Sequence, residues 1–215
     1  MTGLSSSPQV QKGALVAYAF PDLVPSLVVF QYNPETLTRS LTPRTAEGAV
    51  GRGDALRADG PPEETISLTV EIDAADQLER GDGLATSHGL HPALAMLEGL
   101  LYPPFPLVVA NQALALAGGA FIGGEPVPLA LFVWGAKRVL PVRVQSISIT
   151  EQAFDPSLNP ILVRAELSMR VLSYRELEPG SPAYWVYMAA FTQKEVLAAM
   201  NLVSNAASLG AALPI

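Results

Sequence analysis

The sequence predicts a mainly β protein with one short helix between its strands, followed by a C-terminal helical tail. The segment 65–73 alternates strictly, and its apolar side consists of Ile66, Leu68, Val70 and Ile72. The segments 127–134, 139–150 and 161–172 are rich in apolar and β-branched residues and are bounded by glycine or proline, as strands are. Beyond Pro182 the chain becomes rich in alanine, and apolar residues recur at helical spacing.

The N-terminal third begins with a flexible lead-in over residues 1–12. Two strands are expected over 13–20 and 23–32, separated by proline. The polar stretch 36–62 is longer than an ordinary connection of about 4–6 residues, and we interpret it as a long arm.

In the centre of the chain, the residue pattern predicts one short amphipathic helix. We expect a loop over 76–88 because the segment is charged and contains glycine. Pro92 opens a run in which leucines recur at helical spacing, and Pro103 and Pro104 end it. These leucines are Leu94, Leu97, Leu100 and Leu101.

The last two predicted strands, 139–150 and 161–172, are expected to form a β-hairpin. In 139–150 the apolar pattern changes phase near Gln145 and Ser146, which indicates a bulge. A turn is expected around Asp155 and Asn159, after which five alternate residues share one face of the returning strand: Val163, Ala165, Leu167, Met169 and Val171. We therefore divide the chain into a β-domain over 13–175 and a helical extension over 176–215.

Composition indicates partners other than nucleic acid. The formal net charge is −7 and the thirteen basic residues are scattered, whereas nucleic-acid binders concentrate them. The mean hydropathy of +0.30 is high for a monomer. The helix expected over 184–209 carries charge only at Lys194 and Glu195, so we expect its own domain, another subunit or a membrane surface to cover it.

No membrane span and no secretory signal are predicted. The residues between Glu98 and Glu125 carry no charge, but prolines and glycines interrupt them. The N-terminus lacks a basic stretch leading into an apolar one, so we expect synthesis and assembly in the cytoplasm.

The sequence assigns no catalytic, cofactor-binding or metal-binding residue, and an enzyme is not expected. His88 and His91 lie three apart but have no third ligand at a recognised spacing. Glu71 and Asp73 share a strand face, which a solvated sheet explains.

One ordered set of strings resembles a known family. The set comprises Phe30-Gln31-Tyr32-Asn33-Pro34-Glu35-Thr36-Leu37, Gly60-Pro61-Pro62 before the 65–73 strand, Phe132-Val133-Trp134-Gly135, and the final hairpin with Phe154-Asp155, Asn159-Pro160 and Ala165. Together these strings resemble the tube-type domain of baseplate proteins in phage-tail-like contractile injection systems. The resemblance covers residues 13–172.

The resemblance implies a structural role and a tube-like fold, in which two antiparallel sheets pack as a barrel or sandwich with one helix at the side. Such domains form rings, commonly hexamers, that join a spike or hub protein to the inner tube protein beside other baseplate subunits. Relatives often carry a glycan-binding LysM module after this domain, but residues 176–215 are too short and too apolar for one. On this basis, deleting residues 183–215 is expected to weaken particle incorporation more than folding.

Two other classes of function stay open. A small-molecule-binding β-barrel is favoured by the apolar, glycine-rich span 107–124. A hydrolase using Glu71, Asp73 or His91 is the other.

Overall fold

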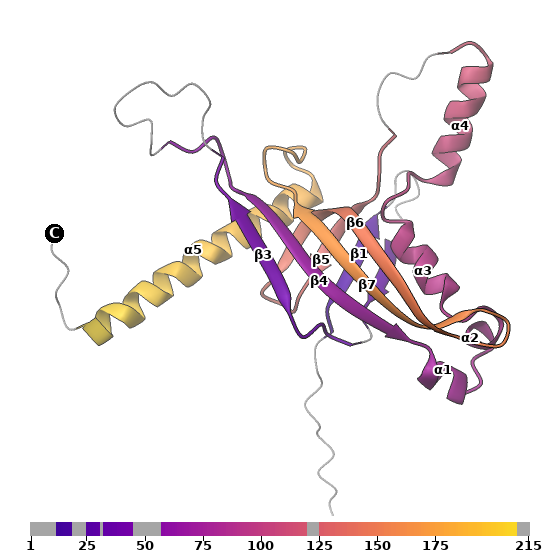
Figure 1. Cartoon of the computed structure of the whole chain (residues 1–215). Helices are drawn as coiled ribbons and strands as arrows, with labels where there is room; N and C mark the ends of the chain where they lie inside the picture. Colours follow the sequence, from indigo (N-terminus) through magenta and orange to yellow (C-terminus); the bar gives the residue numbers. More distant parts are fainter. Residues whose placement is uncertain (1–11, 19–24, 31, 45–56, 120–124, 210–215) are drawn as a thin grey trace, which may run out of the picture.

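The computed structural model describes residues 12–18, 25–30, 32–44, 57–119 and 125–209. These residues form a seven-stranded antiparallel sheet, four helices between its strands and a long C-terminal helix (Figure 1). The predicted mainly β fold with a C-terminal helix is confirmed.

The seven strands come from both halves of the chain. They are β1 (Ala14–Tyr18), β2 (Pro25–Val29), β3 (Leu37–Thr42), β4 (Glu63–Asp73), β5 (Leu129–Val133), β6 (Val139–Phe154) and β7 (Pro160–Val171). Their order across the sheet is β2-β1-β5-β6-β7-β4-β3, so β2 and β3 form its two edges.

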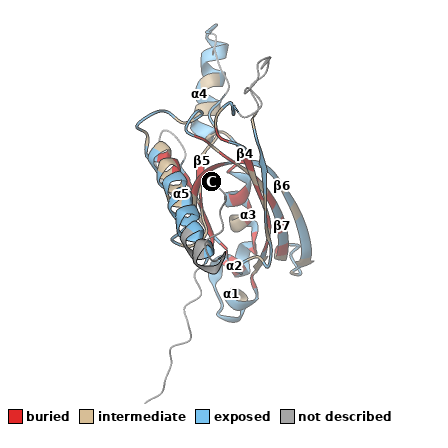
Figure 2. Ribbon diagram, turned by 90° about the vertical axis from the view of Figure 1, so that its left-hand side faces the viewer, coloured by how far each residue is buried: buried red, intermediate tan, exposed pale blue. Residues whose placement is uncertain are grey.

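One face of the sheet carries most of the buried side chains, and we call it the core face. In β4 and β7 alternate residues are buried, as the sequence predicts. Figure 2 shows the sheet curled with α3 (His91–Glu98) on its concave side, and Leu97 and Leu100 join the same apolar cluster as the strands.

A β-bulge in β6 confirms the predicted change of phase. Val144 lies opposite Met169 and Ser146 lies opposite Ser168, so Gln145 is an extra residue in the ladder. Val142 and Val144 face the core before the bulge, whereas Ile147 packs against the core after it.

The expectation of two sheets differs from the structure, in which the described strands form one. The physical reason is the length of β6, whose first residues pair with β5 while residues from Val142 onward pair with β7. Because β6 pairs with both neighbours, it joins β5 and β7 in one continuous sheet.

Two predicted connections contain regular structure instead. The loop expected over 76–88 forms α1 (Ala75–Glu79) and α2 (Gly83–His88), because the Asp82 carboxylate accepts hydrogen bonds from Leu84 N and Ala85 N and begins a helix. The arm expected over 36–62 begins with β3, which pairs with β4 from Leu37 to Thr42. Residues 45–56 of that arm lie outside the described residues.

The remaining helices are α4 (Phe105–Leu116) and α5 (Pro182–Leu209). Pro104 caps α4, and the helix projects from the upper end of the sheet in Figure 1. The first half of α5 packs beside the sheet, and its second half extends away from it.

Candidate functional site

The two histidines end and begin neighbouring helices. His88 is the last residue of α2 and His91 is the first of α3, and both side chains are exposed. Within the part of the chain that the structure describes, no group of three or more histidine, aspartate or glutamate side chains is placed to hold a metal ion.

The two carboxylates of the hydrolase alternative, Glu71 and Asp73 of β4, lie on the face opposite the core. Glu71 is exposed and pairs in register with Arg164 of β7. Asp73 ends the strand, and its Oδ1 accepts a hydrogen bond from Ala75 N at 2.7 Å. This carboxylate therefore starts α1, as in an Asx turn.

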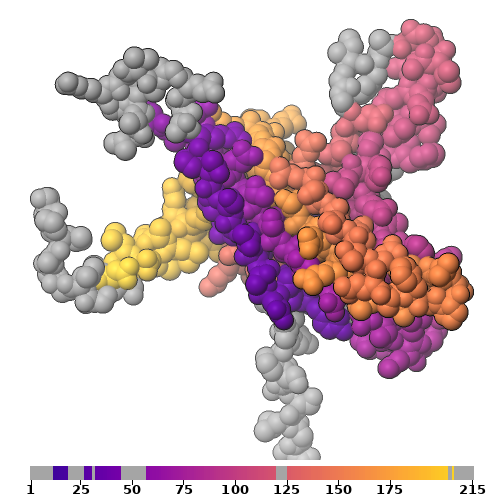
Figure 3. Space-filling view, in the orientation of Figure 1, coloured from indigo at the N-terminus to yellow at the C-terminus, as the bar shows by residue number. Residues whose placement is uncertain are grey.

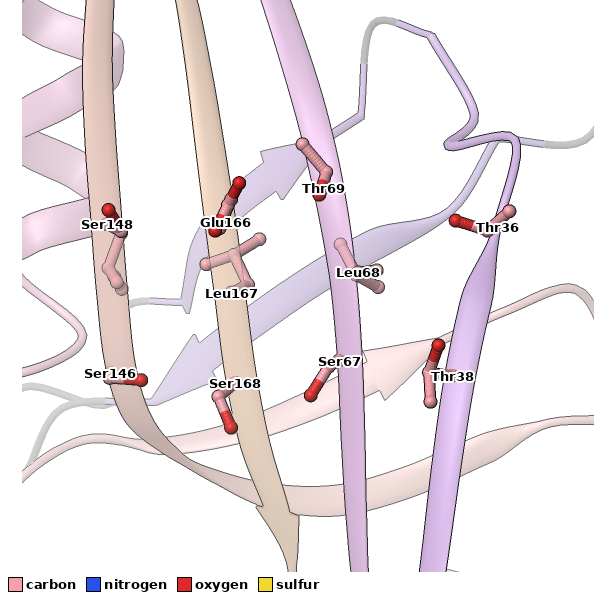
Figure 4. A pocket seen from close by; sticks show the side chains of 11 residues that line it. Thr36, Thr38, Ser67, Leu68, Thr69, Ser146, Ser148, Glu166, Leu167 and Ser168 are labelled. Atoms are coloured by element: carbon pink, nitrogen blue, oxygen red, sulfur yellow. The ribbon is translucent and has the colours of Figure 1, made fainter.

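The sheet presents a polar surface, made mainly of hydroxyl side chains, on the face opposite the core (Figure 4). Thr38, Ser67, Ser168 and Ser146 lie in register across β3, β4, β7 and β6. On the same face, the residues two positions further along these strands are also polar. Together these side chains line a shallow depression of about 320 Å³. We call its hydrophilic lining the polar face: Thr36, Thr38, Ser67, Thr69, Ser146, Ser148, Glu166 and Ser168.

Helix α4 has no buried residue among its twelve. Phe105 at its start is 77% exposed and Leu116 at its end is 90% exposed. Its other large apolar side chains with high exposure are Val109 and Leu114. In the space-filling view this helix stands clear of the sheet (Figure 3).

The first half of α5 is anchored to the sheet. Ala183 and Tyr187 are buried, and Tyr187 belongs to the main core cluster. One helical turn further, the Tyr187 ring stacks on Phe191 with a centroid distance of 6.5 Å.

An ionic cluster fixes the middle of α5 to the start of β4, and we call it the Glu64 cluster. The Glu64 side chain is only 5% exposed and accepts hydrogen bonds from Arg39 Nε at 2.8 Å and from Lys194 Nζ at 3.0 Å. Burial raises the pKa of Glu64, but the hydrogen bonds from Lys194 and Arg39 outweigh it and leave the pKa below its ordinary value. The cluster thus links β3, β4 and α5.

Every residue of α5 from Lys194 to Leu202 is exposed. Four of these residues have large apolar side chains: Val196, Leu197, Met200 and Leu202. Near the beginning of the helix, Trp185 is 62% exposed. Of the three covers expected for this helix, its own domain, another subunit or a membrane surface, the described part of its own domain does not cover residues 194–202.

A second ion pair holds the base of the arm against the segment before α5. Arg175 Nη1 donates to Asp59 Oδ1 at 2.6 Å. Gly60 has φ +91°, and a Cβ there would lie 2.6 Å from Arg175 Nε, so glycine is required for this close approach.

An apolar groove of about 490 Å³ lies between the start of α5 and strands β1 and β5. Its apolar lining consists of Tyr18, Leu129, Leu131, Leu177, Pro182, Ala183 and Val186. By contrast, the span 107–124 that favoured a ligand-binding barrel forms most of α4 as far as it is described, and α4 lies outside the sheet.

The sequence analysis predicted neither the polar face nor α4. The polar face has a readable signal, because Ser67 and Thr69 alternate with the apolar residues of β4 and Ser146 and Ser148 follow the bulge. The signal for α4 is weaker, since a helix that is apolar on all sides has no periodicity.

No protein-family model and no curated protein matches the sequence. No helix in the described part of the chain combines the length and hydrophobicity needed to cross a bilayer.

Proposed function

We propose that this protein is a structural subunit of a contractile injection system, a baseplate or tube adaptor that forms a ring between the spike or hub and the inner tube. It acts by assembly and catalyses no reaction. The observation that carries the proposal is the projection of α4 and of the second half of α5 from the sheet with their large apolar side chains exposed. Soluble monomers seldom expose apolar surface of this extent, and it is typical of subunit interfaces.

The edges of the sheet support a ring. β2 and β3 lie at opposite edges, and each pairs with one strand only among the described residues. Unpaired edges are an aggregation hazard unless something covers them. If β2 of one copy pairs with β3 of the next, the backbone hydrogen bonds of both edge strands are satisfied. Such a heterologous contact forms a closed ring when the rotation between successive copies divides a full turn evenly.

The polar face supports a role as the wall of a channel. Small hydroxyl side chains keep water in contact with the sheet but present few charges to a passing molecule. This face and the interface helices are separate surfaces, so a subunit can line a channel and contact its neighbours at once.

The choice of this particular assembly rests on the resemblance of residues 13–172 to tube-type domains. In this proposal the ring contains six copies, as is common in that family, and binds the spike or hub protein, the inner tube protein and other baseplate subunits. The chain is made and assembled in the cytoplasm, and the finished particle is either released or stays there. A tube-like fold for the curled sheet belongs to the same proposal.

The full chain tests the proposal when it is purified alone and with the products of neighbouring genes. Native mass spectrometry and negative-stain images are expected to show closed rings or complexes with tube or spike proteins. A chain that stays monomeric at every concentration, and that co-purifies with none of these products, would contradict the proposal.

The apolar groove favours a second function, binding of a small apolar molecule. Native mass spectrometry of the monomer under gentle conditions is then expected to show an added mass that the Leu131→Glu variant lacks. A monomer of unmodified mass, together with ring formation, would exclude this function.

A further inference from the structure

We propose that the ring contact includes, beside the sheet edges, a helix pair in which α4 of one copy packs against the second half of α5, residues 194–202, of the next copy. The inference rests on the proposed ring and names the two surfaces that form it. Its partner is a second copy of this chain.

The composition of α4 requires a cover on more than one side. Only Asn111 and Gln112 among its twelve residues have polar side chains, and Asn111 Nδ2 already donates to Glu125 Oε1 at 3.1 Å. A helix that is apolar all round is normally buried. Here none of its residues is buried by its own chain.

A protein partner fits α4 better than a lipid surface. Twelve residues span about 18 Å, too short for a hydrocarbon core of roughly 30 Å. Helices that lie in the membrane interface carry lysine and arginine on their polar side, and residues 99–124 contain neither. The helix therefore lacks the groups that would anchor it to phospholipid.

The second half of α5 has the matching properties on the same chain. It is as exposed as α4, and residues 196–215 carry no charge. The two helical segments themselves contain no ionised group other than Lys194 and Glu195, which lie at the edge of the contact, so packing them together carries little cost of burying charge. Ala198 and Ala199 on α5 and Ala110 and Ala113 on α4 permit a close approach of the two helices.

The placement of the two helices indicates a contact between different copies. In Figure 1, α4 and α5 extend from the sheet in different directions, so within one chain these two helices do not cover each other. Each chain offers one of each surface, which gives a heterologous contact that repeats around a ring. The Glu64 cluster holds α5 in its extended position before the partner arrives, and this reduces the cost of ordering it.

Cross-linking tests the contact directly, because the chain contains no cysteine. Leu114→Cys in α4 and Met200→Cys in α5 are made as separate full-length variants and treated with a short bis-maleimide, alone and mixed. The mixture is expected to give a covalent dimer that neither variant gives alone. The matched control mixes Met200→Cys with Ser148→Cys from the polar face, which is expected to stay unlinked.

The outcomes separate this inference from the ring itself. If rings form in electron micrographs but the mixture gives no dimer, the α4–α5 contact is wrong and the proposed function stands. A dimer from Leu114→Cys alone means that α4 packs on α4, which also overturns the contact. If neither rings nor dimers form, both proposals fail.

A second pair of variants tests the energetics. Leu116→Glu places a charge on the most exposed leucine of α4, and Leu84→Glu does the same on α2, where the leucine is 59% exposed. Leu116→Glu is expected to raise the concentration at half assembly at least tenfold, about 1.4 kcal/mol, with an unchanged melting temperature. Leu84→Glu is expected to change neither. Equal effects of both variants would contradict the contact. It would also be contradicted if the parent chain bound neutral phospholipid vesicles and the Leu116→Glu variant did not.

Discussion

Glu64 lies on the core face of β4, at the same alternation as Ile66 and Leu68, yet its side chain is ionised. Arg39 and Lys194 neutralise it from two different elements. The sequence contained a signal for this residue, since extending the alternation of 65–73 by one step places an acid on the buried side. Its two partners were beyond prediction because they lie 25 and 130 residues away.

Replacing this carboxylate is expected to destabilise the fold. Glu64→Gln keeps the shape but removes the charge that both cations face, so we expect a loss of about 1–3 kcal/mol in the free energy of unfolding, measured by chemical denaturation. Glu166→Gln on the exposed polar face is the matched control and is expected to change it by less than about 0.5 kcal/mol. Equal losses in both variants would show that the cluster contributes nothing specific.

Glu64 and Glu176 are expected to cause part of the protein's sensitivity to acid. For Glu176, as for Glu64, burial raises the pKa, but hydrogen bonds from Ser173 and Arg170 outweigh it and keep the pKa below its ordinary value of 4.5. A depressed pKa contributes stability that is complete above about pH 4.5 and is lost as the pH falls through the folded-state pKa. Denaturation curves at about pH 6 and pH 3 are expected to show a smaller difference between Glu64→Gln and the parent chain at the lower pH. A difference that grows on acidification would refute this assignment.

Gly89 ends α2 in a backbone conformation that favours glycine, with φ +53° and ψ −132°. A Cβ there would lie 2.5 Å from the Pro160 carbonyl oxygen, which is fixed because it accepts a hydrogen bond from Leu90 N at 2.8 Å. Gly89→Ala is therefore expected to lower the free energy of unfolding by about 2–3 kcal/mol. Gly83→Ala, where a Cβ meets nothing within 4 Å, is the control and is expected to cost nothing.

At the level of elements, α5 divides into an anchor and an extension. Deleting residues 183–215 removes the buried Ala183 and Tyr187 as well as Lys194, so this deletion is expected to damage folding, unlike the expectation from the sequence. Deleting 196–215 instead leaves the anchor intact. We expect the shorter deletion to keep the melting temperature within a few degrees while abolishing ring formation in native mass spectrometry. Rings formed by this truncated chain would show that the extension has no role in assembly.

The elements that sequence reasoning identified are those with a one-sided apolar pattern. β4, β7 and α3 each bury one face, and their alternation or helical spacing follows directly from that. β3 was missed because it is an edge strand whose sequence LTRSLT leaves most side chains exposed. No local pattern distinguishes such a strand from a polar loop, because its partner strand supplies the order.

For the whole molecule, one apolar cluster joins strands from both edges of the sheet with α3 and α5. We therefore expect a single unfolding transition in which far-UV circular dichroism and tryptophan fluorescence coincide. In the Trp185→Phe variant, Trp134 reports alone from its place beside Phe132, at a ring-centroid distance of 5.9 Å. Separate midpoints for the two signals would indicate that the sheet has two halves that unfold independently.

The bulge at Gln145 determines which side of the protein meets water. Without that extra residue, Ser146 and Ser148 would turn toward the core and Ile147 and Ile149 would turn toward the polar face. Substitutions in this strand therefore disturb the fold less than an insertion or deletion, which would turn every following side chain to the other face. In related chains we expect the count of residues between the bulge and the hairpin to be kept even where the sequence has diverged.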